Sequence, residues 1–131
     1  MYMLDTNICI YIIKKRPSTV LTRFQTISSE DLYISVMTVA ELQYGVEKSN
    51  AKNKNQEILD DFISRLQVLP WEETAVQYYS KIRNYLEAKG TPIGNMDMLI
   101  AAHCQTENYI LITNNIREFE RIPDLKVENW M

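Results

Sequence analysis

Short β-rich runs alternate with helix-patterned segments along this chain, and the alternation constrains its fold more than any other feature. In the longer segments, apolar residues recur every three to four positions, as on one face of a helix. Expected strands cover 1–5, 32–37, 67–70, 109–113 and 125–128, and expected helices cover 18–27, 38–48, 55–66, 72–89, 95–105 and 115–120. The pattern predicts an α/β fold with a mainly parallel sheet of four to five strands.

Residues 7–16 are the ambiguous segment, because they are apolar on nearly every side until a basic end. A buried helix and a buried strand both fit this pattern. Thr6 or Asn7 is a suitable cap for the helix, and Pro17 is a suitable stop. Thr38 is expected to open the next long helix, and Gly90 to follow the end of the helix over 72–89.

Composition places the chain among ordinary globular proteins. It has 131 residues, 46% hydrophobic and 24% charged, so we expect one ordered domain over 1–131. No membrane span and no signal peptide are expected, since the apolar runs are short and Asp5 interrupts the start. Cys9 and Cys104 have no paired spacing and are expected to be buried reduced thiols, which predicts a cytoplasmic location. The net charge of −3 gives no global sign of nucleic-acid binding, which would need a local basic patch.

Acidic residues recur where the expected strands end. Asp5 ends the first strand, Glu41 follows the second, Asp97 opens the helix before the fourth, and Glu118 follows the fourth. Functional sites of parallel sheets form beyond the carboxyl ends of the strands. Clustered carboxylates raise one another's pKa and are costly unless a cation lies between them. The sheet order, which spacing does not reveal, decides whether they cluster.

Each acid also has a local explanation. Asp5 is a suitable helix cap, Thr38-x-x-Glu41 fits a capping box, and Asp97 is a first-turn acid favoured by the helix dipole. If the acids do cluster, their hard oxygens suit Mg²⁺ or Mn²⁺. Zinc is disfavoured because the chain has one histidine, His103, which lies on an apolar helix where a core role is expected.

Four sequence blocks, in this order, resemble the PIN-domain ribonucleases and in particular the VapC toxins of bacterial toxin–antitoxin pairs. They are MLDTN at the start, TVAEL-x-x-G at 38–45, G-x-x-D-x-x-IAAH at 94–103 and LITNN-x-x-EF at 111–119. The resemblance implies an α/β/α sandwich and Mg²⁺- or Mn²⁺-dependent cleavage of RNA. It also implies a tRNA target, often the initiator tRNA cut in its anticodon loop, and hence inhibition of translation. A VapB antitoxin partner, homodimers and larger toxin–antitoxin assemblies are implied as well.

The resemblance assigns roles to individual residues. Asp5 and Asp97 are expected to hold the metal, and Glu41 to bind it through water or act as a general base. Many relatives carry an Asp where Asn115 stands, so either Glu118 supplies the fourth catalytic carboxylate or it is a solvent-facing helix acid. The expected supporting residues, which would hydrogen-bond the acids or simply cap helices, are Thr6, Asn7, Thr113 and Asn115.

Substrate and partner contacts are expected on basic segments and helix grooves. Lys14, Lys15 and Arg16 form the basic segment expected to bind RNA, with a plain solvated face as the alternative. The grooves around the early helices are the expected surface for the antitoxin.

Two other functions compete with RNA cleavage. A haloacid-dehalogenase-like phosphatase also begins with an Asp after its first strand, but Asn7 stands where its second Asp belongs. A non-catalytic PIN-like binding module is favoured by the missing Asp at 115 and disfavoured by Asp5, Glu41 and Asp97.

Overall fold

The computed structural model describes all residues, 1–131, and centres on a five-stranded sheet in which every pairing is parallel. The strand order is β3-β2-β1-β4-β5, which confirms the predicted α/β class and its mainly parallel sheet. The strands are β1 (Tyr2–Leu4), β2 (Leu32–Ser35), β3 (Gln67–Leu69), β4 (Ile110–Ile112) and β5 (Val127–Glu128).

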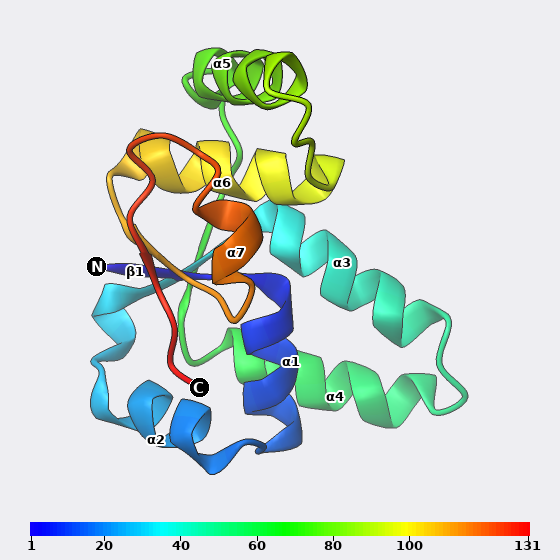
Figure 1. Ribbon diagram of the computed structural model, residues 1–131. Helices are drawn as coiled ribbons and strands as arrows, with labels where there is room; N and C mark the ends of the chain where they lie inside the picture. Colours follow the sequence, from blue (N-terminus) through cyan, green and yellow to red (C-terminus); the bar gives the residue numbers. More distant parts are fainter.

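Helices cover both faces of the sheet (Figure 1). They are α1 (Thr6–Lys14), α2 (Ser18–Thr26), α3 (Val36–Glu47), α4 (Lys52–Ile63), α5 (Ala75–Ala88), α6 (Asn95–Glu107) and α7 (Ile116–Phe119), with a 3₁₀ turn, η1 (Ser29–Asp31). In the view of Figure 1, α5 and α6 lie above the sheet, α1, α2 and α4 lie below it, and α3 and α4 form a hairpin that extends to one side. No helix has the length and apolarity needed to cross a membrane.

Successive residues of each central strand point to opposite faces of the sheet and belong to two separate hydrophobic cores. Leu4 and Ile112 join the cluster under α1, α2 and α4, whereas Met3 and Leu111 join the cluster under α5 and α6. All four are fully buried. Strands covered on both faces are apolar in almost every position, which is why the short runs of this chain show little alternation.

Three local predictions were wrong or are now decided. Residues 7–16 are mostly helical, as α1, and the cap of this helix is Asp5, not Thr6 or Asn7. The helix expected to open at Thr38 begins at Val36 and is capped by Ser35. The capping box of Thr38 and Glu41 therefore does not form. Residues 32–37 were predicted as one strand because Val36 is β-branched. Ser35 nevertheless ends the strand and caps the helix, so the helix begins two residues earlier than predicted.

The sheet order brings the predicted acids to one edge. From β1 the chain adds β2 and β3 on one side, and then returns to add β4 and β5 on the other side. The order therefore reverses next to β1, and Leu4 pairs with Ile112 in register. Asp5 and Thr113 follow these two residues at the carboxyl edge, which is where crevices form in sheets of this type.

Candidate functional site

Asp5 lies at the centre of the site and is 4% exposed. Its Oδ1 accepts the backbone N–H of Ile8 over 3.0 Å, and its Oδ2 accepts the hydroxyl of Thr113. Burial raises the pKa of Asp5, while these two hydrogen bonds oppose that rise and the charge of Glu41 adds to it. Asp5 therefore does cap α1, but its carboxylate is also held in one fixed orientation beside a second acid.

Glu41 faces Asp5 from the second turn of α3. Its Oε1 accepts the hydroxyl of Thr6 over 2.5 Å, and the Thr6 hydroxyl also lies 3.4 Å from that of Thr38. Thr38 is fully buried and precedes Glu41 by three residues, so both lie on one face of the helix. This face of α3 is directed at the start of α1, and Glu41 is not used in capping.

Asp97 lies in the first turn of α6 and is half-buried. Burial, as the largest cause, and then the charges of Asp5, Glu41 and Glu118 together raise its pKa to about 6. Three acids from separate segments of the chain therefore act on this one carboxyl group. The structure thus brings together all four acids that the sequence singled out; their catalytic role stays a prediction.

Asn115 explains how Glu118 is held. The amide Nδ2 of Asn115 donates to Oε2 of Glu118 over 2.9 Å, and its backbone N–H donates to the hydroxyl of Thr113 over 2.9 Å. Thr113 in turn donates to Asp5. Asn115, which stands where many relatives carry an acid, therefore directs the carboxylate of Glu118, one helical turn later, toward the cluster.

The predicted supporting residues contribute unequally. The hydroxyls of Thr6 and Thr113 contact the acids directly. Asn7 contributes its backbone amide, which favours the ionised form of Asp5, while its side chain is exposed. Sequence reasoning missed Thr38 as a neighbour of the site, although its spacing from Glu41 was the available signal.

The donor set fits a hard divalent cation such as Mg²⁺ or Mn²⁺. Its carboxylate oxygens are the ligands that these ions prefer, and the pKa of Asp97 is raised by burial and, after that, by the negative charge of the other acids. No three or more Asp, Glu, His or Cys side chains lie close enough together to hold an ion among them, so an ion here would be bound by one or two carboxylates. Mg²⁺ usually keeps several waters when bound to one or two carboxylates, so this geometry suits it.

Binding of Mn²⁺ by the metal-free protein is expected to weaken below about pH 6. Asp97 must lose its proton to serve as a ligand, and its pKa is raised to about 6. Affinity should therefore fall about tenfold for each pH unit below that value. Electron paramagnetic resonance titrations with Mn²⁺ between pH 5 and pH 8 measure this slope, and equal affinities at pH 5 and pH 7 would contradict the role of Asp97.

The basic segment Lys14, Lys15 and Arg16 lies away from the acids. Asp5 caps the first turn of α1, whereas these residues end it, about 13 Å further along the helix axis. Lys15 instead lines an apolar groove between α1, α2 and α4. RNA binding by this segment stays a prediction, and its place in the fold shows that it is not part of the acidic pocket.

Comparison with known proteins identifies the family. The PIN domain family matches residues 2–125. Ribonuclease VapC2 of Rickettsia felis is 48% identical over 98% of this chain and 97% of that protein. The tRNA(fMet)-specific endonuclease VapC of Salmonella typhimurium is 43% identical over 98% of this chain and 97% of that protein.

Solved structures agree with the sequence comparison. The crystal structure of VapBC2 from Rickettsia felis bound to a DNA fragment from its promoter superposes with a TM-score of 0.94. That toxin is 47% identical, and the match covers 99% of this chain and 98% of the other. With a matching fold, matching length and four acids at the carboxyl edge of its sheet, this chain belongs to the VapC ribonucleases of the PIN-domain family.

Proposed function

We propose that this protein is a metal-dependent endoribonuclease toxin that cleaves a tRNA and inhibits translation, and that a VapB-like antitoxin controls it. The observation that carries the proposal is that the sheet order brings four acids from separate segments together, where burial and the charges of the other three raise the pKa of Asp97. Such a cluster is costly without a cation, and RNA brings phosphates to a cation. A close relative is named a tRNA(fMet)-specific endonuclease, which supports a tRNA substrate. RNA cleavage and two free buried cysteines suit the cytoplasm.

The chain's own residues position the reaction. Asp5 and Asp97 would hold the ion, and the hydrogen bonds from Ile8 and Thr113 fix the orientation of Asp5. When bound, the ion neutralises charge on the scissile phosphate and lowers the pKa of water. Glu41, oriented by Thr6, accepts a proton from the attacking water. The water oxygen bonds to phosphorus, the ester P–O bond breaks, and the leaving oxygen takes up a proton.

Incubation of the purified protein with total tRNA tests the proposal. Cleavage is expected with Mg²⁺ or Mn²⁺ and is expected to stop with EDTA. Cleavage that survives EDTA, or that survives Asp5→Ala in correctly folded protein, would reject a metal-dependent mechanism. Release of phosphate from small esters would favour a phosphatase instead, and RNA binding without cutting would favour a non-catalytic module.

Glu118→Gln is expected to lower the cleavage rate or the Mn²⁺ affinity about tenfold. Glu118 acts on Asp97 and is held toward the cluster by Asn115. Glu120→Gln is the matched control, because Glu120 is an exposed acid beside the same short helix. Single-turnover cleavage and Mn²⁺ titration measure both effects, and equal, negligible losses in the two variants would reject Glu118 as the fourth acid.

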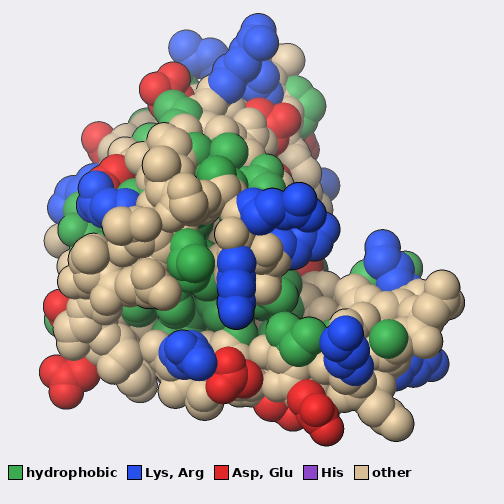
Figure 2. Space-filling model, turned by 90° about the horizontal axis from the view of Figure 1, so that it is seen from below, with side chains coloured by type: hydrophobic (Ala, Val, Ile, Leu, Met, Phe, Trp, Pro, Cys, Tyr) green, Lys and Arg blue, Asp and Glu red, His purple; other side chains and the backbone are tan.

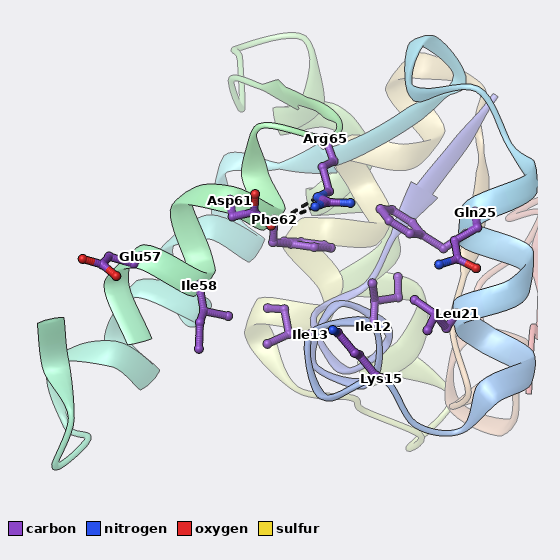
Figure 3. A pocket seen from close by; sticks show the side chains of 11 residues that line it. Ile12, Ile13, Lys15, Leu21, Gln25, Glu57, Ile58, Asp61, Phe62 and Arg65 are labelled. Atoms are coloured by element: carbon purple, nitrogen blue, oxygen red, sulfur yellow. Dashed lines mark hydrogen bonds and ion pairs between the residues drawn. The ribbon is translucent and has the colours of Figure 1, made fainter. Parts of the chain in front are cut away.

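A groove between α1, α2 and α4 is the surface we assign to the antitoxin. It encloses about 600 Å³ and has apolar walls that include Ile12, Leu21 and Phe62. Figure 2 shows this face, where apolar side chains gather in a hollow bordered by Lys and Arg side chains. In Figure 3, Lys15 and Arg65 reach over the groove from the ends of α1 and α4. Relatives were solved as VapBC complexes, which supports an antitoxin as the partner of this chain.

The charges at the groove add a requirement on the antitoxin. Arg65 pairs with Asp61 over 3.2 Å, whereas Lys15 has no ion-pair partner in the structure. An amphipathic segment with an apolar face and a carboxylate for Lys15 therefore fits this groove best.

Ile58→Asp is expected to weaken binding of the cognate antitoxin by about 30-fold and to leave RNA cleavage unchanged. Ile58 lines the groove, is 40% exposed and can be replaced without opening a core cavity. A charge at an apolar contact costs about 2 kcal/mol at an interface hot spot. Val76→Asp on α5 is the matched control, since Val76 is 48% exposed and lies outside the groove. Isothermal titration calorimetry measures both, and equal losses would place the antitoxin elsewhere.

A further inference from the structure

A buried hydrogen bond joins α6 to the start of α3, outside the acidic pocket. His103 of α6 is 1% exposed, and its Nδ1 lies 2.8 Å from Oγ of Ser35. Ser35 is also fully buried; it ends β2 and caps α3 by accepting the backbone N–H of Met37 over 3.1 Å. The helix that carries Asp97 is therefore tied to the cap of the helix that carries Glu41.

The hydrogen-bonding capacity of Ser35 favours one direction for this contact. Its Oγ already accepts from Met37, and its one hydroxyl hydrogen needs an acceptor. Burial lowers the pKa of His103, so the imidazole is neutral at pH 7 and can offer Nδ1 as that acceptor. The ring hydrogen then lies on Nε2, which is buried and has no partner.

Packing alone gives no reason for a histidine at this position. A buried N–H without a partner costs free energy, and an aliphatic side chain of similar size would avoid that cost. The neighbouring buried positions of α6 are apolar, as Ile100, Ala101 and Cys104 show. The hydrogen bond between Nδ1 and Ser35 accounts for a polar side chain at this position.

We propose that His103 is a positioning residue that fixes the place of Glu41 through Ser35. The inference rests on the proposed RNA cleavage, in which Glu41 takes part. Glu41 lies six residues beyond the cap, about 9 Å along the axis of α3. A small tilt of the helix at Ser35 therefore moves the Glu41 carboxylate by about 1 Å, and a displacement of this size can cost up to about 10²-fold in rate.

Two substitutions of His103 distinguish the effect of its Nδ1 hydrogen bond from the effect of its side-chain volume. His103→Leu is expected to lower kcat for RNA cleavage about tenfold or more, with KM changed less than about twofold. His103→Asn is expected to recover most of kcat, because a carboxamide oxygen can accept the Ser35 hydroxyl. An Asn variant as slow as the Leu variant at equal thermal stability would overturn the proposal.

Ser35→Ala tests whether His103 acts through Ser35. The loss in kcat is expected to be at least that of His103→Leu, because this variant also loses the cap of α3, and the double variant should be no slower than the slower single variant. Losses that multiply in the double variant would show that His103 acts by another route, and would overturn the proposal.

Nuclear magnetic resonance gives two readouts that do not depend on cleavage. His103 is the only histidine of the chain, so one imidazole signal set is expected, with the hydrogen on Nε2 at pH 7. The Met37 amide should exchange with solvent faster in His103→Leu than in the wild type or in His103→Asn. Unchanged exchange in the Leu variant would defeat this inference and leave the cleavage proposal standing. A wild type with a protected Met37 amide that cuts no RNA would instead defeat the cleavage proposal.

Discussion

Asp97→Asn is expected to abolish RNA cleavage and, in the same protein, to raise the free energy of unfolding at pH 7 without divalent ions. The loss of cleavage follows from removing a carboxylate that the ion needs, and should reach at least about 10²–10³-fold. The gain in stability follows from the raised pKa of Asp97, which is about 6 against 3.8 for an ordinary aspartate. Asparagine keeps the shape of the side chain and removes its charge from the field of three other acids.

The sign of the stability change depends on pH. Because the pKa of Asp97 is raised in the folded state, the folded protein holds more protons than the unfolded chain between about pH 4 and pH 6. The free energy of unfolding therefore falls as pH rises through this window, and at pH 7 the full cost of the charged group is present. Since Asp97 is partly exposed, we expect Asp97→Asn to recover about 1–2 kcal/mol at pH 7 and almost nothing at pH 4.

Urea denaturation in EDTA at pH 4 and pH 7 measures this change, and a tRNA cleavage assay measures the loss of activity. Added Mg²⁺ should stabilise the wild type and not the variant, since only the wild type offers the full site. Asp60→Asn is the matched control, because Asp60 is an exposed acid on α4. An Asp97→Asn protein that is less stable than the wild type at pH 7 would show that Asp97 is a structural acid.

The sequence predicted the kinds of element and the acids well, because both depend on local patterns. The apolar runs marked all five strands, and the resemblance to PIN-domain ribonucleases selected Asp5, Glu41 and Asp97. The clustering of these acids could not be predicted from a local pattern, because it depends on the sheet order, in which β4 lies beside β1 on the side opposite β2. That order is set by the packing of two helix layers and not by any single segment.

Details at the helix starts were predicted least well, because several residues there can serve as caps. Ser35, Val36 and Thr38 stand close together, and the sequence favoured Thr38 because Glu41 follows it at capping-box spacing. In the fold, Thr38 is buried beside Thr6 and cannot also cap the helix. Likewise, the contact between Asn115 and Glu118 follows from the turn after β4, whose geometry the sequence does not specify.

Trp130→Ala is expected to lower the free energy of unfolding by about 3–5 kcal/mol, a large part of the roughly 5–15 kcal/mol of an ordinary domain. Trp130 is 3% exposed and contacts the ring of Tyr2 edge-on, with centroids 5.6 Å apart. Its Nε1 donates to Glu128 over 3.1 Å, and the same carboxylate pairs with Arg23 over 2.9 Å. One side chain thus ties the end of the chain to β1 and α2.

Trp130→Ala should also disturb the site, because β5 supports Thr113, the residue that orients Asp5. The backbone N–H of Thr113 donates to the carbonyl of Glu128 over 3.0 Å, and the Thr113 hydroxyl donates to Asp5. Trp130→Phe, which keeps a ring against Tyr2 and loses the N–H, should cost less than Trp130→Ala. Tyr44→Ala is the surface control, since Tyr44 is 65% exposed, and should change stability by no more than about 0.5 kcal/mol. If urea denaturation shows Trp130→Ala to be as mild as Tyr44→Ala, the end of the chain does not stabilise the fold, and the orientation of Asp5 must depend on β4 and α1 alone.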